Sequence, residues 1–204
     1  MAEPEFLQAR GLTCRRGGRM VIDGLSFEVR AGEALSVSGP NGSGKSTLLR
    51  LLAGLVELDR GSFVLKGSTL EDPASLRQEL VYLGHADAVK DSLDVRQNVT
   101  VQAGLLGGSG SIDRALGTFG LDPIHDLPAR YLSSGQRRRV ALCRLVTCAR
   151  PLWLLDEPAV GLDRANRQTL ETLVTGHLDR GGAVVLASHG DLVIAGAHGL
   201  SLGR

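Results

Sequence analysis

The sequence lacks the features that mark secreted, zinc-binding or membrane-spanning chains. Its 204 residues include only three cysteines, Cys14, Cys143 and Cys148, and no C-x-x-C pair. This spacing excludes the common cysteine metal sites, and the missing C-x-x-C-H excludes covalent haem attachment to the chain. An odd, scattered set suits a reducing cytosol, where these side chains simply pack in the interior.

Long apolar runs and an excess of charge are also missing. No stretch approaches the about 18 consecutive apolar residues of a membrane-spanning helix, and the acidic residues 1–5 lack the basic and apolar regions of a signal peptide. A formal net charge of +1 gives no global field for nucleic acid. We therefore expect one soluble domain over residues 1–204, whose membrane role, if any, comes through a partner.

What is present is a glycine-rich stretch at residues 39–47 that fits G-x-x-x-x-G-K-[ST]. In such a loop the backbone N–H groups wrap the phosphates of a nucleotide, and the following helix N-terminus favours an anion. A predicted strand before the loop and a leucine-rich helix after it make a chance glycine-rich turn the weaker interpretation. We expect Lys45 to reach the β- and γ-phosphates and Ser46 to bind Mg²⁺. The predicted binding set is Gly39, Pro40, Asn41, Gly42, Ser43, Gly44, Lys45, Ser46 and Thr47.

The rest of the chain alternates between predicted strands and helices. Residues 6–12, 26–30 and 61–67 predict a small, largely antiparallel sheet. Three apolar runs are typical of parallel strands buried on both faces; these are 80–83, 152–155 and 183–187. The predicted helices are 93–106, 112–119, 134–148 and 165–178, with a helical turn at 76–80. The pattern predicts an α/β fold with a parallel-sheet core.

Two carboxylates, Asp156 and Glu157, end the apolar strand 152–155. An Asp-Glu pair alone commonly marks only a strand that enters solvent. Beside a phosphate loop it gains weight, because a Mg²⁺–nucleotide complex needs a carboxylate. We expect Asp156 to hold Mg²⁺, directly or through water, and Glu157 to orient or deprotonate an attacking water.

Two further motifs are open to more than one interpretation. Residues 132–136, Leu-Ser-Ser-Gly-Gln, precede an arginine-rich helix. In one interpretation, Ser133 is the N-cap of this helix and residues 137–139 form a solvated basic face. In the other, the helix N-terminus is a second phosphate-binding site. The residues alone slightly favour the first. His189 follows the strand 183–187, where it is either a packing residue or a donor to a γ-phosphate.

Together these motifs resemble the ATPase subunits of ABC transporters over nearly the whole chain. The order is the phosphate loop, residues 132–136, 154–158, 161–163, and His189. The resemblance implies a P-loop NTPase fold with an antiparallel β subdomain and a helical subdomain near residues 86–150. It also implies a head-to-tail homodimer that sandwiches two ATP, which reverses the preference for capping at residues 132–136. Ser133, Gly135 and Gln136 then bind ATP across the dimer, Glu157 is the catalytic base and His189 the switch histidine, and Asp163 contacts the second copy.

Two positions depart from the family pattern. His85 stands where the family has a glutamine that senses Mg²⁺ and the attacking water. A neutral histidine can accept a hydrogen bond, and its charge changes near neutral pH. Arg16 stands where an adenine-stacking aromatic is expected, and a planar guanidinium can also stack on a base.

These details most resemble the ATP-binding subunit of the bacterial cytochrome c maturation complex, the haem exporter ATPase. That resemblance implies integral membrane partners of that complex, attachment to the cytoplasmic face of the inner membrane, and haem export or delivery. The ATPase of another small exporter, for drug, lipid or lipoprotein, is the alternative. A soluble ABC protein acting in DNA repair or translation is a third, although such proteins usually carry a coiled-coil insertion or two ATPase halves. We expect no nucleic-acid partner.

Overall fold

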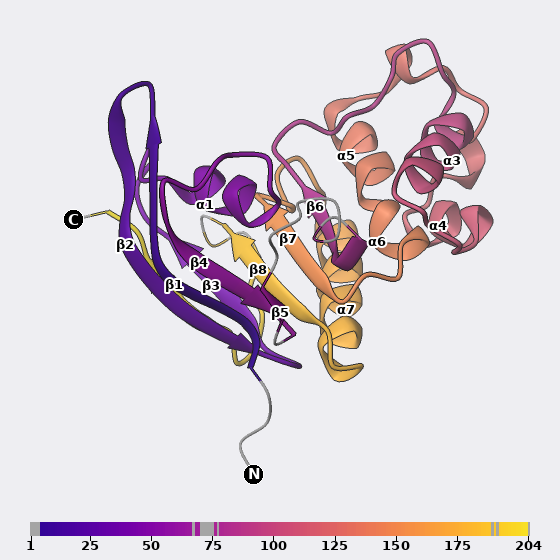
Figure 1. The fold of residues 1–204 in the computed structure, drawn as a ribbon. Helices are drawn as coiled ribbons and strands as arrows, with labels where there is room; N and C mark the ends of the chain where they lie inside the picture. Colours follow the sequence, from indigo (N-terminus) through magenta and orange to yellow (C-terminus); the bar gives the residue numbers. More distant parts are fainter. Residues whose placement is uncertain are drawn as a thin grey trace.

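The computed structural model describes residues 5–66, 68–69, 76, 78–188, 190 and 192–203. Two sheets and a group of helices build it (Figure 1). The antiparallel sheet has the order β2-β1-β4-β5, from β1 Glu5–Arg16, β2 Arg19–Arg30, β4 Arg60–Leu65 and β5 Ser68–Thr69. The parallel sheet has the order β6-β7-β8-β3-β9, from β3 Ala34–Ser38, β6 Leu80–Leu83, β7 Leu152–Asp156, β8 Ala183–Ala187 and β9 His198–Ser201.

The parallel sheet is the core of the molecule because both of its faces are covered. Successive strand residues point to opposite faces, so Trp153 and Leu155 of β7 enter one apolar cluster while Leu152 and Leu154 enter another. The cluster containing Trp153 includes residues of α7 Arg164–Asp179 and of the helical group. The other cluster includes α1 Lys45–Leu52 and the antiparallel sheet. The prediction of strands buried on both faces is confirmed for β7 and β8, whose five residues each are all buried.

The helical group forms a separate lobe beside the parallel sheet (Figure 1). It consists of α3 Val95–Leu105, α4 Ile112–Thr118, two 3₁₀ turns at Asp122–Ile124 and Ala129–Tyr131, α5 Ser134–Leu142 and α6 Arg144–Thr147. All of these elements lie within the predicted range 86–150. The division of the chain into subdomains at these numbers stays a prediction.

One helix prediction is wrong in detail, since residues 134–148 do not form a continuous helix. The break falls at Cys143, which belongs to neither α5 nor α6. Its N–H is shared between the carbonyls of Arg139 and Val140, at 3.2 and 3.3 Å, which tightens the last turn of α5. The predicted turn at 76–80 lies partly outside the described residues, and Leu80 already belongs to β6.

All three cysteines are free and buried, which confirms a packing role for them. Burial raises the pKa of the Cys143 thiol to about 12, so this thiol stays protonated at neutral pH. In the part of the chain that the structure describes, no helix is long and apolar enough to cross a bilayer.

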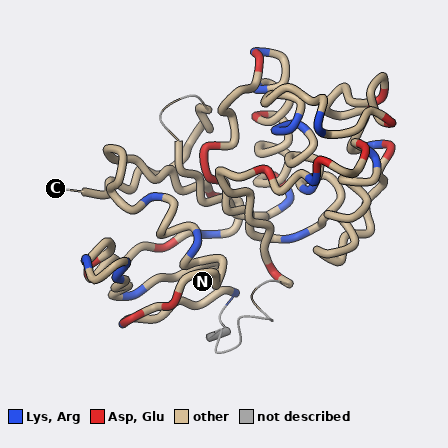
Figure 2. The backbone as a smooth tube through the Cα atoms, turned by 90° about the horizontal axis from the view of Figure 1, so that it is seen from above, with Lys and Arg blue, Asp and Glu red and all other residues tan. Residues whose placement is uncertain are grey.

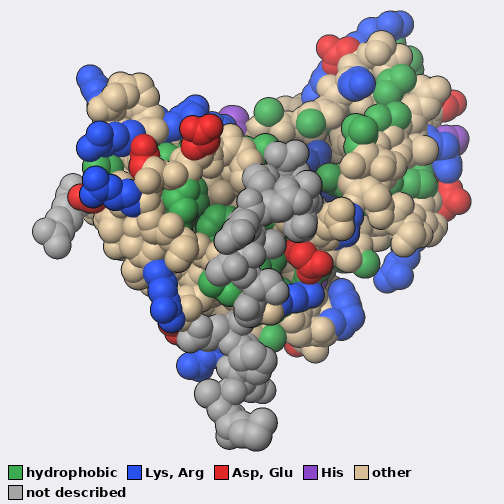
Figure 3. All heavy atoms as spheres, in the orientation of Figure 1, with side chains coloured by type: hydrophobic (Ala, Val, Ile, Leu, Met, Phe, Trp, Pro, Cys, Tyr) green, Lys and Arg blue, Asp and Glu red, His purple; other side chains and the backbone are tan. Residues whose placement is uncertain are grey.

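The surface is hollowed between the lobe of the β1–β2 hairpin and the helical lobe (Figure 3). The carboxyl ends of β7 and β8 point to the side of this hollow (Figure 1). Basic and acidic residues are both scattered over the two lobes (Figure 2). Ligands of parallel α/β sheets bind at the carboxyl ends of strands, so this edge is where a site is expected.

Candidate nucleotide-binding and catalytic site

The glycine-rich loop joins the end of β3 to the start of α1, as predicted. Gly44 is the N-cap of α1 and has φ 101°, a left-handed conformation. A Cβ there would lie 2.9 Å from Cγ1 of Val21, so a larger residue would be strained and would also collide. The close packing of β2 against this turn therefore requires glycine and fixes the direction in which the first turn of α1 faces.

Lys45 lies inside the loop and not on the surface, with only 6% of the residue exposed. Its Nζ donates to the carbonyl oxygens of Gly39 at 2.7 Å and Pro40 at 3.1 Å. An ammonium group has three N–H donors. Two of them hold the loop in shape, and the third is left for an anion in the loop.

Ser46 and Asp156 meet at the edge of the sheet although 110 positions separate them in sequence. The Ser46 hydroxyl donates to Oδ1 of Asp156 at 3.0 Å. Asp156 is 1% exposed, and its Oδ2 is buried without a hydrogen-bond partner among the described residues. A buried, unpartnered carboxylate oxygen is costly unless a ligand satisfies it, so this pair fits a Mg²⁺ site.

The protein alone would provide few ligands for such an ion. Among the described residues there is no group of three or more His, Cys, Asp or Glu side chains placed to hold a metal. Mg²⁺ in nucleotide sites commonly takes one or two protein ligands and fills its octahedron with phosphate oxygens and waters. The pair of Ser46 and Asp156 matches that pattern.

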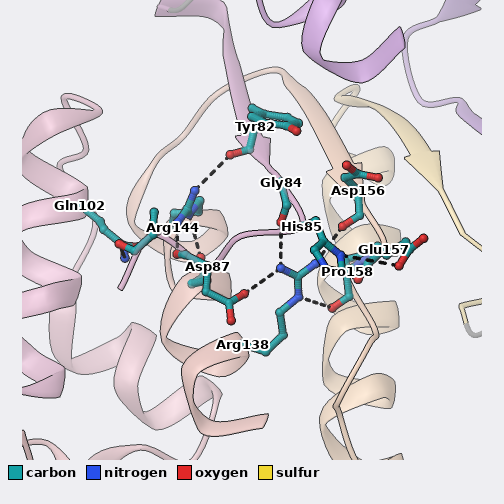
Figure 4. Close-up of polar contacts among 12 residues, drawn as sticks. Tyr82, Gly84, His85, Asp87, Gln102, Arg138, Arg144, Asp156, Glu157 and Pro158 are labelled. Atoms are coloured by element: carbon teal, nitrogen blue, oxygen red, sulfur yellow. Dashed lines mark hydrogen bonds and ion pairs between the residues drawn. The ribbon is translucent and has the colours of Figure 1, made fainter. Parts of the chain in front are cut away.

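Glu157 follows directly and has an unusual backbone. Its φ is 48°, in the left-handed region that costs a residue with a side chain about 1–2 kcal/mol. Its N–H donates to the carbonyl of Ala187 at 2.8 Å, which ties the turn to the end of β8. Its side chain is 25% exposed, and Oε2 lies 3.8 Å from Nδ1 of His85 (Figure 4). The structure thus brings the predicted base and the unusual histidine together.

A pocket of about 580 Å³ joins these groups. Its lining residues are Val21, Asn41, Gly42, Gly44, Lys45, Ser46, Thr47, Arg50, His85 and Glu157. The predicted loop residues Gly39, Pro40 and Ser43 do not line this pocket. The carbonyls of Gly39 and Pro40 accept hydrogen bonds from Lys45. Val21 and Arg50 were not predicted; Arg50 is one helical turn from Ser46, a spacing that indicates a shared helix face.

Residues 132–136 form a second site on the helical lobe. Ser133 is the N-cap of α5: its hydroxyl accepts from the Gln136 N–H at 3.2 Å, and the Gln136 side chain accepts from the Ser133 N–H at 2.8 Å. This capping box confirms the predicted cap. The backbones of Gly135 and Gly161 lie close together. A Cβ at position 135 would lie only 2.6 Å from the Gly161 carbonyl oxygen.

A pocket of about 290 Å³ lies over this contact. It is lined by Ser133, Ser134, Gly135, Gln136, Arg139, Gly161, Leu162, Asp163 and Asn166. Asp163 caps α7, and hydrogen bonds from the backbone and side-chain N–H groups of Asn166 lower the pKa of its carboxyl. The motif at 132–136 and Asp163 therefore share one surface, which has no lining residue in common with the loop pocket.

Arg16, one of the predicted binding residues, lines neither pocket. It is the exposed last residue of β1 at the hairpin tip. Its stacking on adenine stays a prediction. His189 lies outside the described residues.

The prediction of a solvated basic face at residues 137–139 is wrong for its central residue. Arg138 is only 4% exposed and lies among the site residues (Figure 4). Arg144 is likewise buried, at 8% exposed, and burial lowers the pKa of its guanidinium. Helical spacing carries the signal, since Arg138 shares its face of α5 with Ala141 and Leu142, both buried.

Comparison with known proteins identifies the family of the chain. The ABC transporter family model matches residues 22–160. A Nitrobacter winogradskyi protein named cytochrome c biogenesis ATP-binding export protein CcmA is 46% identical, over 93% of this chain and 94% of its own length. The protein of that name from Paramagnetospirillum magneticum is 45% identical, over 99% of this chain and 95% of its own length.

The fold is also that of solved ABC proteins. A putative ABC transporter ATP-binding protein from Pyrococcus furiosus superposes with a TM-score of 0.81 at 21% identity, over 96% of each chain. At this identity the likeness concerns the fold alone. The family model and the two curated relatives show more: the chain belongs to the ABC transporter family, among its cytochrome c biogenesis ATP-binding export proteins.

Proposed function

We propose that the chain binds and hydrolyses ATP with Mg²⁺, as the ATP-binding subunit of a cytochrome c biogenesis exporter. The observation that carries the proposal is the group formed by Lys45, Ser46, Asp156 and Glu157 at the carboxyl edge of the parallel sheet. It combines a buried cation with a free donor, a hydroxyl–carboxylate pair with an unpartnered oxygen, and a half-buried carboxylate at the pocket wall.

Each of these residues has a distinct role in the proposed reaction. Lys45 and the first N–H groups of α1 bind the terminal phosphates. Ser46 and Asp156 hold Mg²⁺, which neutralises charge that develops on the phosphates. Glu157 orients the attacking water and accepts its proton, and His85 lies on the same side of the pocket as a second hydrogen-bonding group.

The second pocket is proposed as the surface that closes over ATP held by another copy of the chain. Ser133, Gly135 and Gln136 would then bind that ATP at the N-terminus of α5, with Asp163 in contact with the second copy. What supports this is that residues 133–136 and Asp163 line one surface separate from the loop pocket. His189 is proposed as the switch histidine from the sequence alone.

The proposed partner is an integral membrane subunit of the cytochrome c maturation complex, at the cytoplasmic face of the inner membrane. The names of the curated relatives support an export role in cytochrome c biogenesis. Haem is the proposed cargo on the resemblance alone. Co-purification with that membrane subunit, and not with an unrelated permease, is the expected result; the reverse would favour another small exporter.

The catalytic assignment is tested with two substitutions and a control. Lys45→Ala should lose ATP binding, while Glu157→Gln should bind ATP and lose about 10²–10³-fold in turnover, within the range for a general base that takes a proton in the transition state. Glu171→Gln on α7 is the matched carboxylate control. Nucleotide binding and steady-state ATPase activity are measured with the membrane subunit present. Wild-type turnover in Glu157→Gln would remove that residue from its role.

A further inference from the structure

The buried guanidinium of Arg138 connects three parts of the proposed site. Nε donates to the carbonyl of Pro158 at 3.2 Å, and Nη2 donates to those of Asp156 at 2.9 Å and Glu157 at 2.7 Å. Nη1 donates to the carbonyl of Gly84 at 2.9 Å and to Oδ1 of Asp87 at 2.8 Å. Arginine has five N–H donors, so this side chain uses its full hydrogen-bonding capacity on the site (Figure 4).

Three of these acceptors belong to the turn that aims Glu157. Arg138 holds three consecutive carbonyls, those of residues 156–158, from the side of α5. Glu157 has a left-handed backbone, which persists only where the surroundings determine it. The guanidinium and the Ala187 carbonyl both hold this turn from other elements.

The other two acceptors belong to the loop between β6 and α3, which carries His85. Gly84 directly precedes His85, and Asp87 follows two residues later. Arg144 ties this loop to the end of β6, because Nη1 donates to the Tyr82 carbonyl at 3.1 Å and Nη2 donates to the Asp87 carbonyl at 3.0 Å. The separation of His85 from Glu157 is therefore determined through Arg138, because one rigid planar group binds both backbones.

We propose that Arg138 is a positioning residue for hydrolysis, which holds Glu157 and His85 at one geometry and ties both to α5. This inference rests on the proposed ATPase function. Arg138 does not line the loop pocket, so it acts through Glu157 and His85 and not on the nucleotide. The N-terminus of α5 carries Ser133, so a movement of α5 reaches the catalytic turn of the same chain.

The test compares Arg138→Gln with Arg137→Gln in the full chain with its membrane subunit. Arg137 lies next to it on α5 but binds Asp91 and the Ala129 carbonyl, outside the catalytic turn. In Arg138→Gln we expect kcat to fall about ten- to hundredfold, since small misplacements of catalytic groups have such effects. KM and ATP affinity should stay within about twofold of the wild type. Arg137→Gln should stay close to the wild type.

A double substitution separates positioning from general destabilisation. If Arg138 acts through Glu157, adding Arg138→Gln to Glu157→Gln should change the residual single-turnover rate less than about twofold, whereas independent effects would multiply. Arg138→Lys is the second variant in case Arg138→Gln does not fold. Lysine keeps the charge but cannot bind all five acceptors, so kcat should fall at least about fivefold at unchanged KM.

The outcomes divide cleanly between the two proposals. The positioning role is overturned by a normal kcat in folded Arg138→Gln or Arg138→Lys. It is also overturned if the effects of Arg138→Gln and Glu157→Gln on the rate multiply. The proposed function is unaffected by either result as long as the wild-type complex hydrolyses ATP. Absence of ATPase activity in the wild-type complex overturns the proposed function itself. A kcat effect that is lost in the Glu157→Gln background supports Arg138 as a positioning residue.

Discussion

At the scale of single residues, His85 is the departure from the family pattern with the most direct chemical consequence. Its Nδ1 lies 3.8 Å from Glu157 Oε2, and its side chain is 72% exposed. We expect His85→Ala to lower the ATPase activity of the complex about tenfold or more, within the range for groups that assist proton transfer. His85→Gln should keep most of the activity, because glutamine also offers a hydrogen-bonding group. Steady-state ATPase with the membrane subunit measures both.

Thermal unfolding provides the control for this pair of variants. An exposed histidine contributes little to folding, so both variants should unfold within about 0.5 kcal/mol of the wild type. Unchanged ATPase activity in His85→Ala would leave His85 as a surface residue that only happens to lie near Glu157. A loss in both variants alike would show that the imidazole ring itself is needed.

Residues differ in how well the sequence predicts their roles. Lys45 and Ser46 were predicted because their loop is continuous in sequence and its chemistry depends on local spacing. The prediction that Arg138 is solvated is wrong, because a run of three arginines is typical of a solvent-exposed helix face. The acceptors that bury Arg138 lie up to 54 positions away in the sequence. Burial of a charge depends on carbonyls that only the tertiary fold assembles.

At the scale of elements, the sequence predicts the buried strands but not the edge strand of the sheet or the point where a helix breaks. The strands β7 and β8 were predicted because a run of apolar residues is sufficient for a sheet buried on both faces. The short edge strand β9 was missed, since His198–Ser201 is mostly exposed and pairs only with β3. The break at Cys143 was missed because it depends on hydrogen-bond geometry and not on residue type.

The packing of α7 on the parallel sheet has a pH-dependent component at His177. Its ring stacks on Trp153 with centroids 3.9 Å apart, and Nε2 lies 3.1 Å from the Pro151 carbonyl oxygen. Burial lowers the pKa of His177, although the hydrogen bond to Pro151 opposes the shift. The folded state therefore favours the neutral ring, and its contribution to stability is present above the unfolded pKa of about 6.5 and is lost as pH falls below it.

We expect His177→Phe to remove this pH dependence. Phenylalanine keeps the stacking on Trp153 but loses the hydrogen bond, so the variant should be less stable by about 1 kcal/mol near neutral pH. Between about pH 7 and pH 5 its free energy of unfolding in urea should fall less than that of the wild type. Parallel curves for the two proteins would contradict the assignment to His177.

At the scale of the whole molecule, the two separate pockets fit the proposed dimer. In that proposal the loop pocket binds the phosphates from one side, and the surface of residues 133–136 and Asp163, at the N-terminus of α5, covers them from the second copy. Each copy of the proposed dimer would then carry half of each of two sites. A closed symmetric pair uses both halves without any new element, which is the commonest way for chains to associate.

The dimer is expected to persist only when ATP is bound and not hydrolysed. With ATP and Mg²⁺, Glu157→Gln should sediment as a dimer, and it should return to a monomer when ATP is removed. Adding Ser134→Arg should prevent dimer formation while ATP binding by the monomer stays within about twofold. Ser134 is exposed and lines the second pocket, but the cap of α5 is made by Ser133 and Gln136, so α5 stays intact. Thr172→Arg on the exposed face of α7 is the matched control and should still dimerise. A Ser134→Arg protein that dimerises like its control would show that residues 132–136 do not face the second copy.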